Sequence, residues 1–130
     1  MSALGVPGLF ITGTDTDAGK THVGLALLKS LRDLGVRTAA MKPVASGAVV
    51  TPEGLRNIDA ERLRAAASVN ATYSQVNPFC FEPPTAPELA AKEAGVQIDP
   101  VAVFKCARQL ACAADYLIVE GIGGWRVPLT

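Results

Sequence analysis

The residues best suited to chemistry lie in a glycine-rich segment near the N-terminus. Residues 13–21 have the sequence Gly-Thr-Asp-Thr-Asp-Ala-Gly-Lys-Thr. Backbone N–H groups of such a loop can surround a phosphate, while Lys20 supplies positive charge and the Thr21 hydroxyl can ligate Mg²⁺. The spacing Gly-x5-Gly-Lys-Thr is one residue longer than the commoner phosphate-loop pattern, so a glycine-rich turn before an ordinary helix is the alternative. An apolar run before the loop and an amphipathic segment after it favour nucleotide binding.

Two carboxylates and a second lysine can complete such a site. Mg²⁺ prefers oxygen ligands and retains several waters, so Asp59 and Glu120 beside Thr21 would suffice. Lys42 can neutralise charge that develops on a transferred phosphoryl group. Each also has an ordinary alternative. An acid such as Asp59 stabilises a first helical turn without a metal, and Lys42 and Glu120 can be solvated groups at strand ends.

The segment after Glu120 is rich in glycine. Gly121, Gly123 and Gly124 allow the backbone to approach a ligand, with Ile122 and Trp125 as apolar walls, and the alternative is a flexible turn. His22 follows the phosphate loop but has no neighbouring His or Cys in the sequence, so we expect no metal or catalytic role for it.

Three short apolar runs predict strands. They span residues 9–12, 37–41 and 116–119, and the last ends at Glu120-Gly121. Pro43 favours an extended conformation for Lys42, which places this lysine at the carboxyl end of the second strand.

Helical patterns separate these strands. The first predicted helix follows the phosphate loop, ends before Gly35 and has an apolar face of Val23, Leu27, Leu28, Leu31 and Leu34. Asn57 can cap a helix that runs through Ala67. Thr85 and Glu88 have capping-box spacing before another helix, and Asp99-Pro100 predicts a helix that reaches about residue 114. We expect a loop after Pro43 and irregular structure over residues 69–86.

Strands that alternate with helices predict an α/β fold of the P-loop NTPase type. Right-handed crossovers give a parallel sheet with helices on both faces, and ligands gather beyond the carboxyl ends of the strands. Gly13, Lys42 and Glu120 all fall at such ends. No repeat or linker divides residues 1–130, which we interpret as one nucleotide-binding domain. Three parallel strands leave an apolar edge uncovered, so we expect that a C-terminal part is missing.

Composition excludes several broad classes. The 130 residues are 49% hydrophobic, and twelve basic residues balance twelve acidic ones. This balance argues against nucleic acid or an anionic membrane as partner. The first residues lack a secretion signal, no apolar run is long enough to cross a membrane, and we expect a cytoplasmic protein. We interpret Cys80, Cys106 and Cys112 as reduced thiols, because no close pair exists.

Several motifs together resemble the dethiobiotin synthase family. Besides the loop, they are Met-Lys-Pro-Val-Ala-Ser-Gly at 41–47, Thr-Pro-Glu-Gly-Leu-Arg-Asn-Ile-Asp-Ala at 51–60, Val-Asn-Pro-Phe at 76–79 and Val-Glu-Gly-Ile-Gly-Gly-Trp at 119–125. They occur in order over almost the whole chain. The Lys-Pro-Val-Ala-Ser-Gly segment is much more specific than the phosphate loop.

The resemblance implies a reaction and a set of roles. The family uses Mg²⁺ and ATP to join CO2 to 7,8-diaminononanoate, through a carbamate and its mixed anhydride with phosphate, and it acts as a homodimer whose second subunit completes the diamine pocket. Lys42 and Lys20 would then be catalytic, Ser46 would contact the diamine, and Mg²⁺ would bind Thr21, Asp59 and Glu120. ATP would be bound by Asp17, Ala18, Gly19, Lys20, Thr21, Asp59, Glu120, Gly121, Ile122 and Gly123.

Glu88 departs from the family pattern, which often has histidine there, so no role is assigned to it. Two other readings of the phosphate loop stay open. Amidating ligases of the cobyric acid synthase type resemble it but carry a glutaminase domain. Partitioning ATPases typically have an extra lysine early in the loop, where this sequence has Asp15.

Overall fold

The fold is built on a three-stranded parallel sheet. The computed structural model describes residues 4–12 and 19–122. Strand β7 (Tyr116–Glu120) lies between β1 (Gly8–Ile11) and β2 (Thr38–Met41), and both pair with it in parallel. The predicted strands are confirmed to within one or two residues. Because all three strands run the same way, their carboxyl ends meet at one edge of the sheet.

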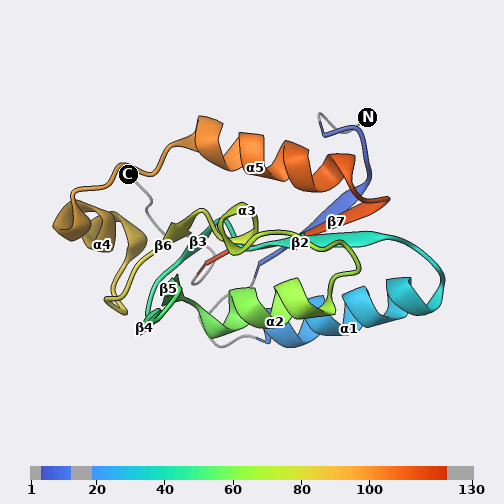
Figure 1. The fold of residues 1–130 in the computed structure, drawn as a ribbon, viewed down its shortest axis with the longest axis horizontal. Helices are drawn as coiled ribbons and strands as arrows, with labels where there is room; N and C mark the ends of the chain where they lie inside the picture. Colours follow the sequence, from blue (N-terminus) through green and yellow to red (C-terminus); the bar gives the residue numbers. More distant parts are fainter. Residues whose placement is uncertain (1–3, 13–18, 123–130) are drawn as a thin grey trace.

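Helices cover both faces of this sheet, as the sequence predicts. Helices α1 (Lys20–Asp33) and α2 (Ile58–Ala66) lie side by side on one face, and α5 (Pro100–Cys112) lies on the other (Figure 1). The short helix α3 (Tyr73–Val76) lies beside β2 and contacts both α2 and α5. One core joins Leu28 and Leu63 to Ile118 of β7. The opposite core joins Leu110 to Met41 and Leu117. Residues from alternate positions of β7 therefore fill both cores.

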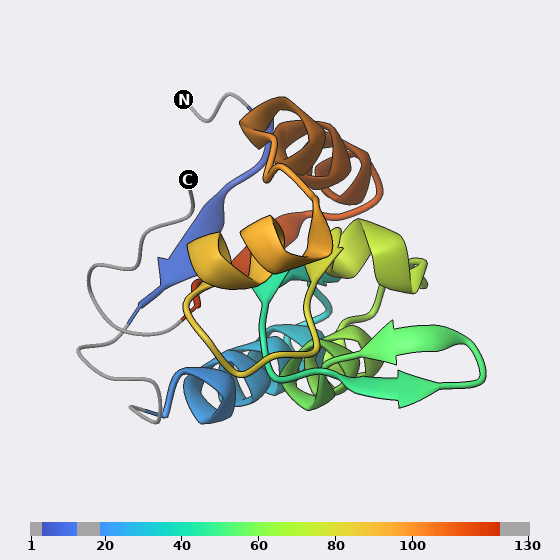
Figure 2. The same ribbon diagram turned by 90° about the vertical axis from the view of Figure 1, so that its left-hand side faces the viewer.

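Short elements interrupt the loop expected after Pro43 and a smaller part of residues 69–86, most of which is irregular as predicted. Strand β3 (Val44–Ala45) pairs in parallel with β6 (Phe79–Cys80), and β4 (Val49–Thr51) pairs with β5 (Gly54–Arg56) as an antiparallel hairpin. Figure 2 shows this hairpin extending outward beside α2. Helix α4 (Pro87–Ala94) closes a small third core. The two predictions of irregular structure were wrong in these stretches because two-residue and three-residue strands have no detectable periodicity.

Two of the three predicted helix caps are confirmed. The Asn57 side chain accepts a hydrogen bond from the backbone N–H of Ala60 at 3.0 Å, and Asp99 accepts one from Val101 at 2.9 Å. The predicted cap at Thr85 is wrong, because α4 starts at Pro87 with Ala86 as its N-cap and no capping side chain among the described residues. Proline is favoured at the first helical position, and here it sets the start of the helix.

The predicted apolar face of α1 is confirmed in its middle and wrong at its ends. Leu27, Leu28 and Leu31 pack into the core, whereas Val23 is 50% exposed and Leu34, just after the helix, is 78% exposed. Gly24 is also buried on this face. A Cβ atom at Gly24 would lie 3.1 Å from the Leu63 side chain, which is closer than ordinary contact. Glycine at this position therefore lets α1 pack closely on α2.

Strand β1 forms an edge of the described sheet, and Phe10 on it is 62% exposed, in agreement with the apolar edge that the sequence predicts.

Among the helices of the described residues, we find none that is both long and apolar enough to cross a membrane.

Candidate active site

The N-terminus of α1 has features of an anion-binding site. Its N-cap, Gly19, has a φ of 82°, in the left-handed region that favours glycine. Within the described residues no side chain caps this end, and its first turn holds no acid. The N–H groups of a first helical turn and the positive end of the helix dipole suit a phosphate. Lys20 and Thr21 follow directly.

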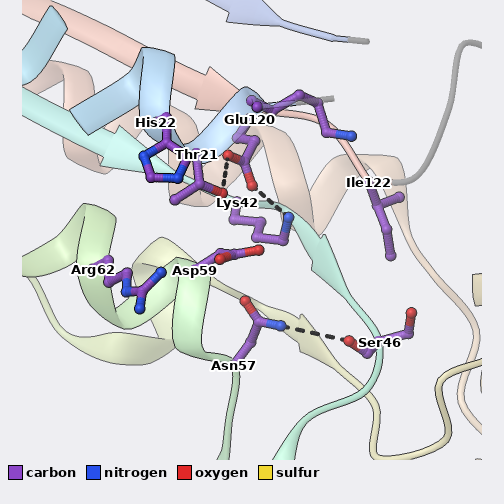
Figure 3. Close-up of a pocket in the computed structure, with 11 residues that line it drawn as sticks. Thr21, His22, Lys42, Ser46, Asn57, Asp59, Arg62, Glu120 and Ile122 are labelled. Carbon is purple, nitrogen blue, oxygen red and sulfur yellow. Dashed lines mark hydrogen bonds and ion pairs between the residues drawn. The ribbon is translucent and has the colours of Figure 1, made fainter. Parts of the chain in front are cut away.

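The Glu120 carboxylate is the centre of the site. Its Oε1 accepts a hydrogen bond from the Thr21 hydroxyl at 2.7 Å, and its Oε2 lies 2.5 Å from Lys42 Nζ (Figure 3). Glu120 is 1% exposed and Lys42 is 5% exposed, so this is a buried ion pair. Burying either charge alone would be strongly unfavourable, and each therefore holds the other in place.

Strand register accounts for this contact. Met41 lies opposite Val119 in the parallel pair of β2 with β7, so the next residues of the two strands, Lys42 and Glu120, emerge together. Ile11 at the end of β1 lies opposite Glu120 on the other side. The chain leaves β1 there to enter the segment that leads to α1. Topology thus brings three distant parts of the sequence to one edge.

A cavity of about 320 Å³ opens over this edge. Of the residues proposed from the sequence, it is lined by Gly19, Lys20, Thr21, Lys42, Ser46, Asp59, Glu120 and Ile122. These residues come from the N-terminus of α1, the ends of β2, β3 and β7, and the first turn of α2. The structure therefore brings together most of the predicted site.

Sequence reasoning missed three residues that line the same cavity. His22, set aside for lack of a metal partner, lies beside Thr21 at the start of α1 (Figure 3). Arg62 follows Asp59 by three residues on α2, and this spacing places both on one face of the helix. Asn57 was predicted only as a helix cap. Its position two residues before Asp59 was the available signal for a place in the site.

Some predicted residues are not placed in this cavity. Asp17, Ala18 and Gly123 lie outside the described residues. Gly121 is described but does not line the cavity. Instead, its N–H donates to the Ile11 carbonyl at 3.0 Å, and a Cβ at this position would lie 2.9 Å from the Phe10 ring. Packing against β1 therefore explains this glycine.

The side-chain oxygens of the cavity suit a hard cation that would also bind phosphate oxygens. Asp59 and Glu120 face one cavity with the Thr21 hydroxyl, and all three offer oxygen. Within residues 4–12 and 19–122 no cluster of three or more His, Cys, Asp or Glu side chains forms a complete metal cage. Mg²⁺ keeps several waters and needs few protein ligands, so the two carboxylates fit it. A zinc or calcium cage is not supported by these residues.

Fold and site together define a P-loop nucleotide-binding domain. Residues 7–130 match the AAA domain family AAA_26. The match covers nearly the whole sequence, and the chain belongs to this family.

Individual relatives indicate a narrower class of protein than the family match does. The chain is 51% identical over 125 residues to the ATP-dependent dethiobiotin synthetase BioD of Pseudomonas paraeruginosa, a match that covers 95% of the chain and 55% of the relative. It is 49% identical over 121 residues to the protein of the same name from Marinobacter nauticus, a match that covers 92% of the chain and 52% of the relative. It is 46% identical over 121 residues to the ATP-dependent dethiobiotin synthetase BioD 1 of Escherichia coli, a match that covers 93% of the chain and 54% of the relative. The resemblance predicted from the motifs is confirmed, and the chain spans about half the length of these relatives.

Proposed function

We propose that this chain carries the phosphate-binding and catalytic part of an ATP-dependent dethiobiotin synthase. The observation that supports this most is the contact of Glu120 with both Thr21 and Lys42 at the floor of the cavity. It joins the phosphate loop to the lysine of the Lys-Pro-Val-Ala-Ser-Gly segment. The relatives named above are ATP-dependent dethiobiotin synthetases, which supports ATP-dependent dethiobiotin synthesis. Ring closure on a diamine is what the family resemblance implies.

The proposed reaction has three steps. One amine of 7,8-diaminononanoate adds to CO2 and loses a proton, giving a carbamate. A carbamate oxygen attacks the γ-phosphorus of ATP, the bond to the β-phosphate oxygen breaks, and ADP leaves. The second amine then attacks the carbonyl carbon of the mixed anhydride and loses a proton, phosphate departs with the bonding electrons, and the cyclic urea closes. No side chain has to form a covalent intermediate.

The protein's part is positioning and charge stabilisation. Lys20 at the α1 N-terminus and Lys42 at the end of β2 supply positive charge from two sides of the cavity. Phosphoryl transfer depends mainly on alignment and on such charges, because negative charge spreads over the transferred group. Ser46 lines the same cavity and is the proposed contact for the diamine. Lys42 must exchange Glu120 for phosphate during this reaction.

Mg²⁺ would be held by Thr21, Asp59 and Glu120, and it would neutralise charge on the β- and γ-phosphates. ATP would also contact Asp17, Ala18, Gly19 and Gly123. We further propose a cytoplasmic homodimer in which a second subunit completes the diamine pocket. The ATP contacts and the homodimer rest on the family resemblance, and the cytoplasmic location rests on the sequence pattern.

Release of ADP distinguishes this function from its rivals. ADP should appear when Mg-ATP, bicarbonate and 7,8-diaminononanoate are all present, and omission of the diamine should stop it. Parallel reactions replace the diamine with double-stranded DNA, anionic lipid vesicles, or glutamine with a carboxylic acid acceptor. Stimulation by DNA or lipid but not by the diamine would indicate a switch ATPase, and stimulation by glutamine would indicate an amidating ligase.

A further inference from the structure

A short helix behind the cavity contacts the backbone of the proposed catalytic lysine. Lys42 donates its backbone N–H to the Val76 carbonyl at 2.8 Å, and its own carbonyl accepts a hydrogen bond from the Asn77 amide at 2.8 Å. Val76 ends α3, and Asn77 is its C-cap. Both backbone groups of Lys42 are thus held by this one segment. It includes the first two residues of the Val-Asn-Pro-Phe motif, to which the proposed function assigns no role.

The same helix also holds the start of α2. The Tyr73 hydroxyl accepts a hydrogen bond from the backbone N–H of Asn57 at 2.7 Å and donates one to Asn77 Oδ1 at 2.7 Å. All three residues are buried, with exposures of 7%, 8% and 3% for Tyr73, Asn57 and Asn77. Burial raises the pKa of Tyr73, so the hydroxyl keeps the proton that it donates. A continuous chain of buried hydrogen bonds therefore runs from Asn57 to Lys42.

Asn57 connects this chain of hydrogen bonds to two parts of the cavity, the first turn of α2 and the backbone at Ser46. Its side-chain oxygen caps α2 and so fixes the first turn, which contains Asp59. Its side-chain amide lies 3.5 Å from the Ser46 carbonyl, a long hydrogen bond. Asn57 itself lines the cavity.

We propose that Tyr73 and Asn77 are positioning residues that fix Lys42 and Asp59 relative to each other. The proposal rests on the proposed function for the roles of these two residues. The network joins the lysine of β2 to the carboxylate of α2, whereas the phosphate-binding turn of α1 lies outside it. Loss of the network should therefore impair metal binding and phosphoryl transfer more than nucleotide binding, because partners that orient metal ligands and reacting groups affect those steps directly.

Two substitutions test the two parts of the network separately, the contact of Tyr73 with Asn57 and the contact of Asn77 with Lys42. Tyr73→Phe removes the hydroxyl that holds Asn57 and leaves the Asn77 amide on Lys42. Asn77→Asp keeps an oxygen that can accept from Tyr73 but removes the amide that donates to the carbonyls of Lys42 and Phe79. Tyr116→Phe and Asn70→Asp are matched controls, because neither side chain has a hydrogen bond among the described residues and neither lines the cavity. All variants are compared in the full-length protein below their melting temperatures.

The primary readout is the dissociation constant of Mn²⁺, a paramagnetic substitute for Mg²⁺, measured by electron paramagnetic resonance in the presence of saturating ADP. The second is kcat for ADP release. Tyr73→Phe should weaken Mn²⁺ binding about tenfold or more, and Asn77→Asp should lower kcat by a similar factor. The dissociation constant for ADP without metal should change less than about twofold in both, as should all values in the controls.

The proposal is overturned if both variants fold and keep the wild-type Mn²⁺ affinity and kcat. It is also overturned if ADP binding without metal falls as much as metal binding does, since that pattern reports general loss of structure. A wild-type protein that binds ADP and Mn²⁺ but makes no dethiobiotin would refute the proposed function instead. In that case the Mn²⁺ measurements would still test the role of Tyr73.

Discussion

Lys42 Nζ lies 2.5 Å from Glu120 Oε2, although the two residues are 78 positions apart in the sequence. Parallel pairing of β2 with β7 produces this contact, because Met41 pairs with Val119 and the next residues along the two chains are Lys42 and Glu120. The pair is buried, and Glu120 also accepts the Thr21 hydroxyl. One carboxylate thus connects the phosphate loop, the lysine and the central strand.

Replacing Lys42 tests its proposed role in phosphoryl transfer. Lys42→Gln should abolish product formation but retain substantial ATP binding, because Lys20 and the N-terminus of α1 remain. Isothermal titration with ATP and a product assay check the two parts. Lys105→Gln, on an exposed position of α5 across the sheet, is the control. Normal turnover in the Lys42 variant would refute the assigned role.

Replacing Glu120 tests the proposed metal ligand. Glu120→Gln should raise the Mg²⁺ concentration for half-maximal activity by about tenfold or more. It should also destabilise the fold by about 3–5 kcal/mol, because Lys42 loses the counter-charge of a buried pair. Magnesium titration and denaturant unfolding measure the two effects. Glu93→Gln, on the exposed side of α4, should change neither, and an unaltered Mg²⁺ requirement in the Glu120 variant would rule out the assignment.

Thiol reactivity should follow burial. Burial raises the pKa of the Cys80 thiol, and raises that of Cys106 as well, whereas Cys112 is exposed at the end of α5. A raised pKa leaves less thiolate near neutral pH, and the thiolate is the nucleophile. Iodoacetamide should therefore modify Cys112 first, as followed by mass spectrometry of peptides. The three cysteines should react at similar rates when the protein is unfolded in urea. Labelling of Cys80 before Cys112 in the folded protein would contradict the burial of Cys80 in the structure.

Helix capping gives a stability test with an internal control. Asp99→Ala removes the cap of α5 and should lower the free energy of unfolding by about 1 kcal/mol. Thr85→Ala should have almost no effect, because Thr85 lies outside α4 and the cap position belongs to Ala86. Denaturant unfolding of both variants measures the difference. Equal losses would show that the sequence pattern, rather than the observed start of α4, identifies the cap.

The sequence predicts the part of the site that depends on local pattern. Apolar runs locate the strand ends, and the parallel topology then implies that Lys42 and Glu120 meet near the phosphate loop. Helix caps at Asn57 and Asp99 follow from residue type. These predictions hold because each depends on a few neighbouring residues.

What the sequence does not predict depends on long-range contacts. Strand β3 exists only through its pairing with β6, and α3 is a single turn whose role comes from its contacts with Lys42 and Asn57. The buried position of Gly24 on α1 is set by close packing against Leu63, which hydrophobic periodicity alone cannot show. Arg62 enters the cavity only because α2 packs beside α1.

The most direct test of the central claim is detection of dethiobiotin by mass spectrometry. The full-length gene product is mixed with Mg-ATP, bicarbonate and 7,8-diaminononanoate, with the 130-residue chain assayed in parallel. We predict that the full-length protein forms dethiobiotin and that omission of any one substrate prevents it. Absence of product from folded protein that binds ATP would contradict the proposed function and leave only the nucleotide-binding domain established.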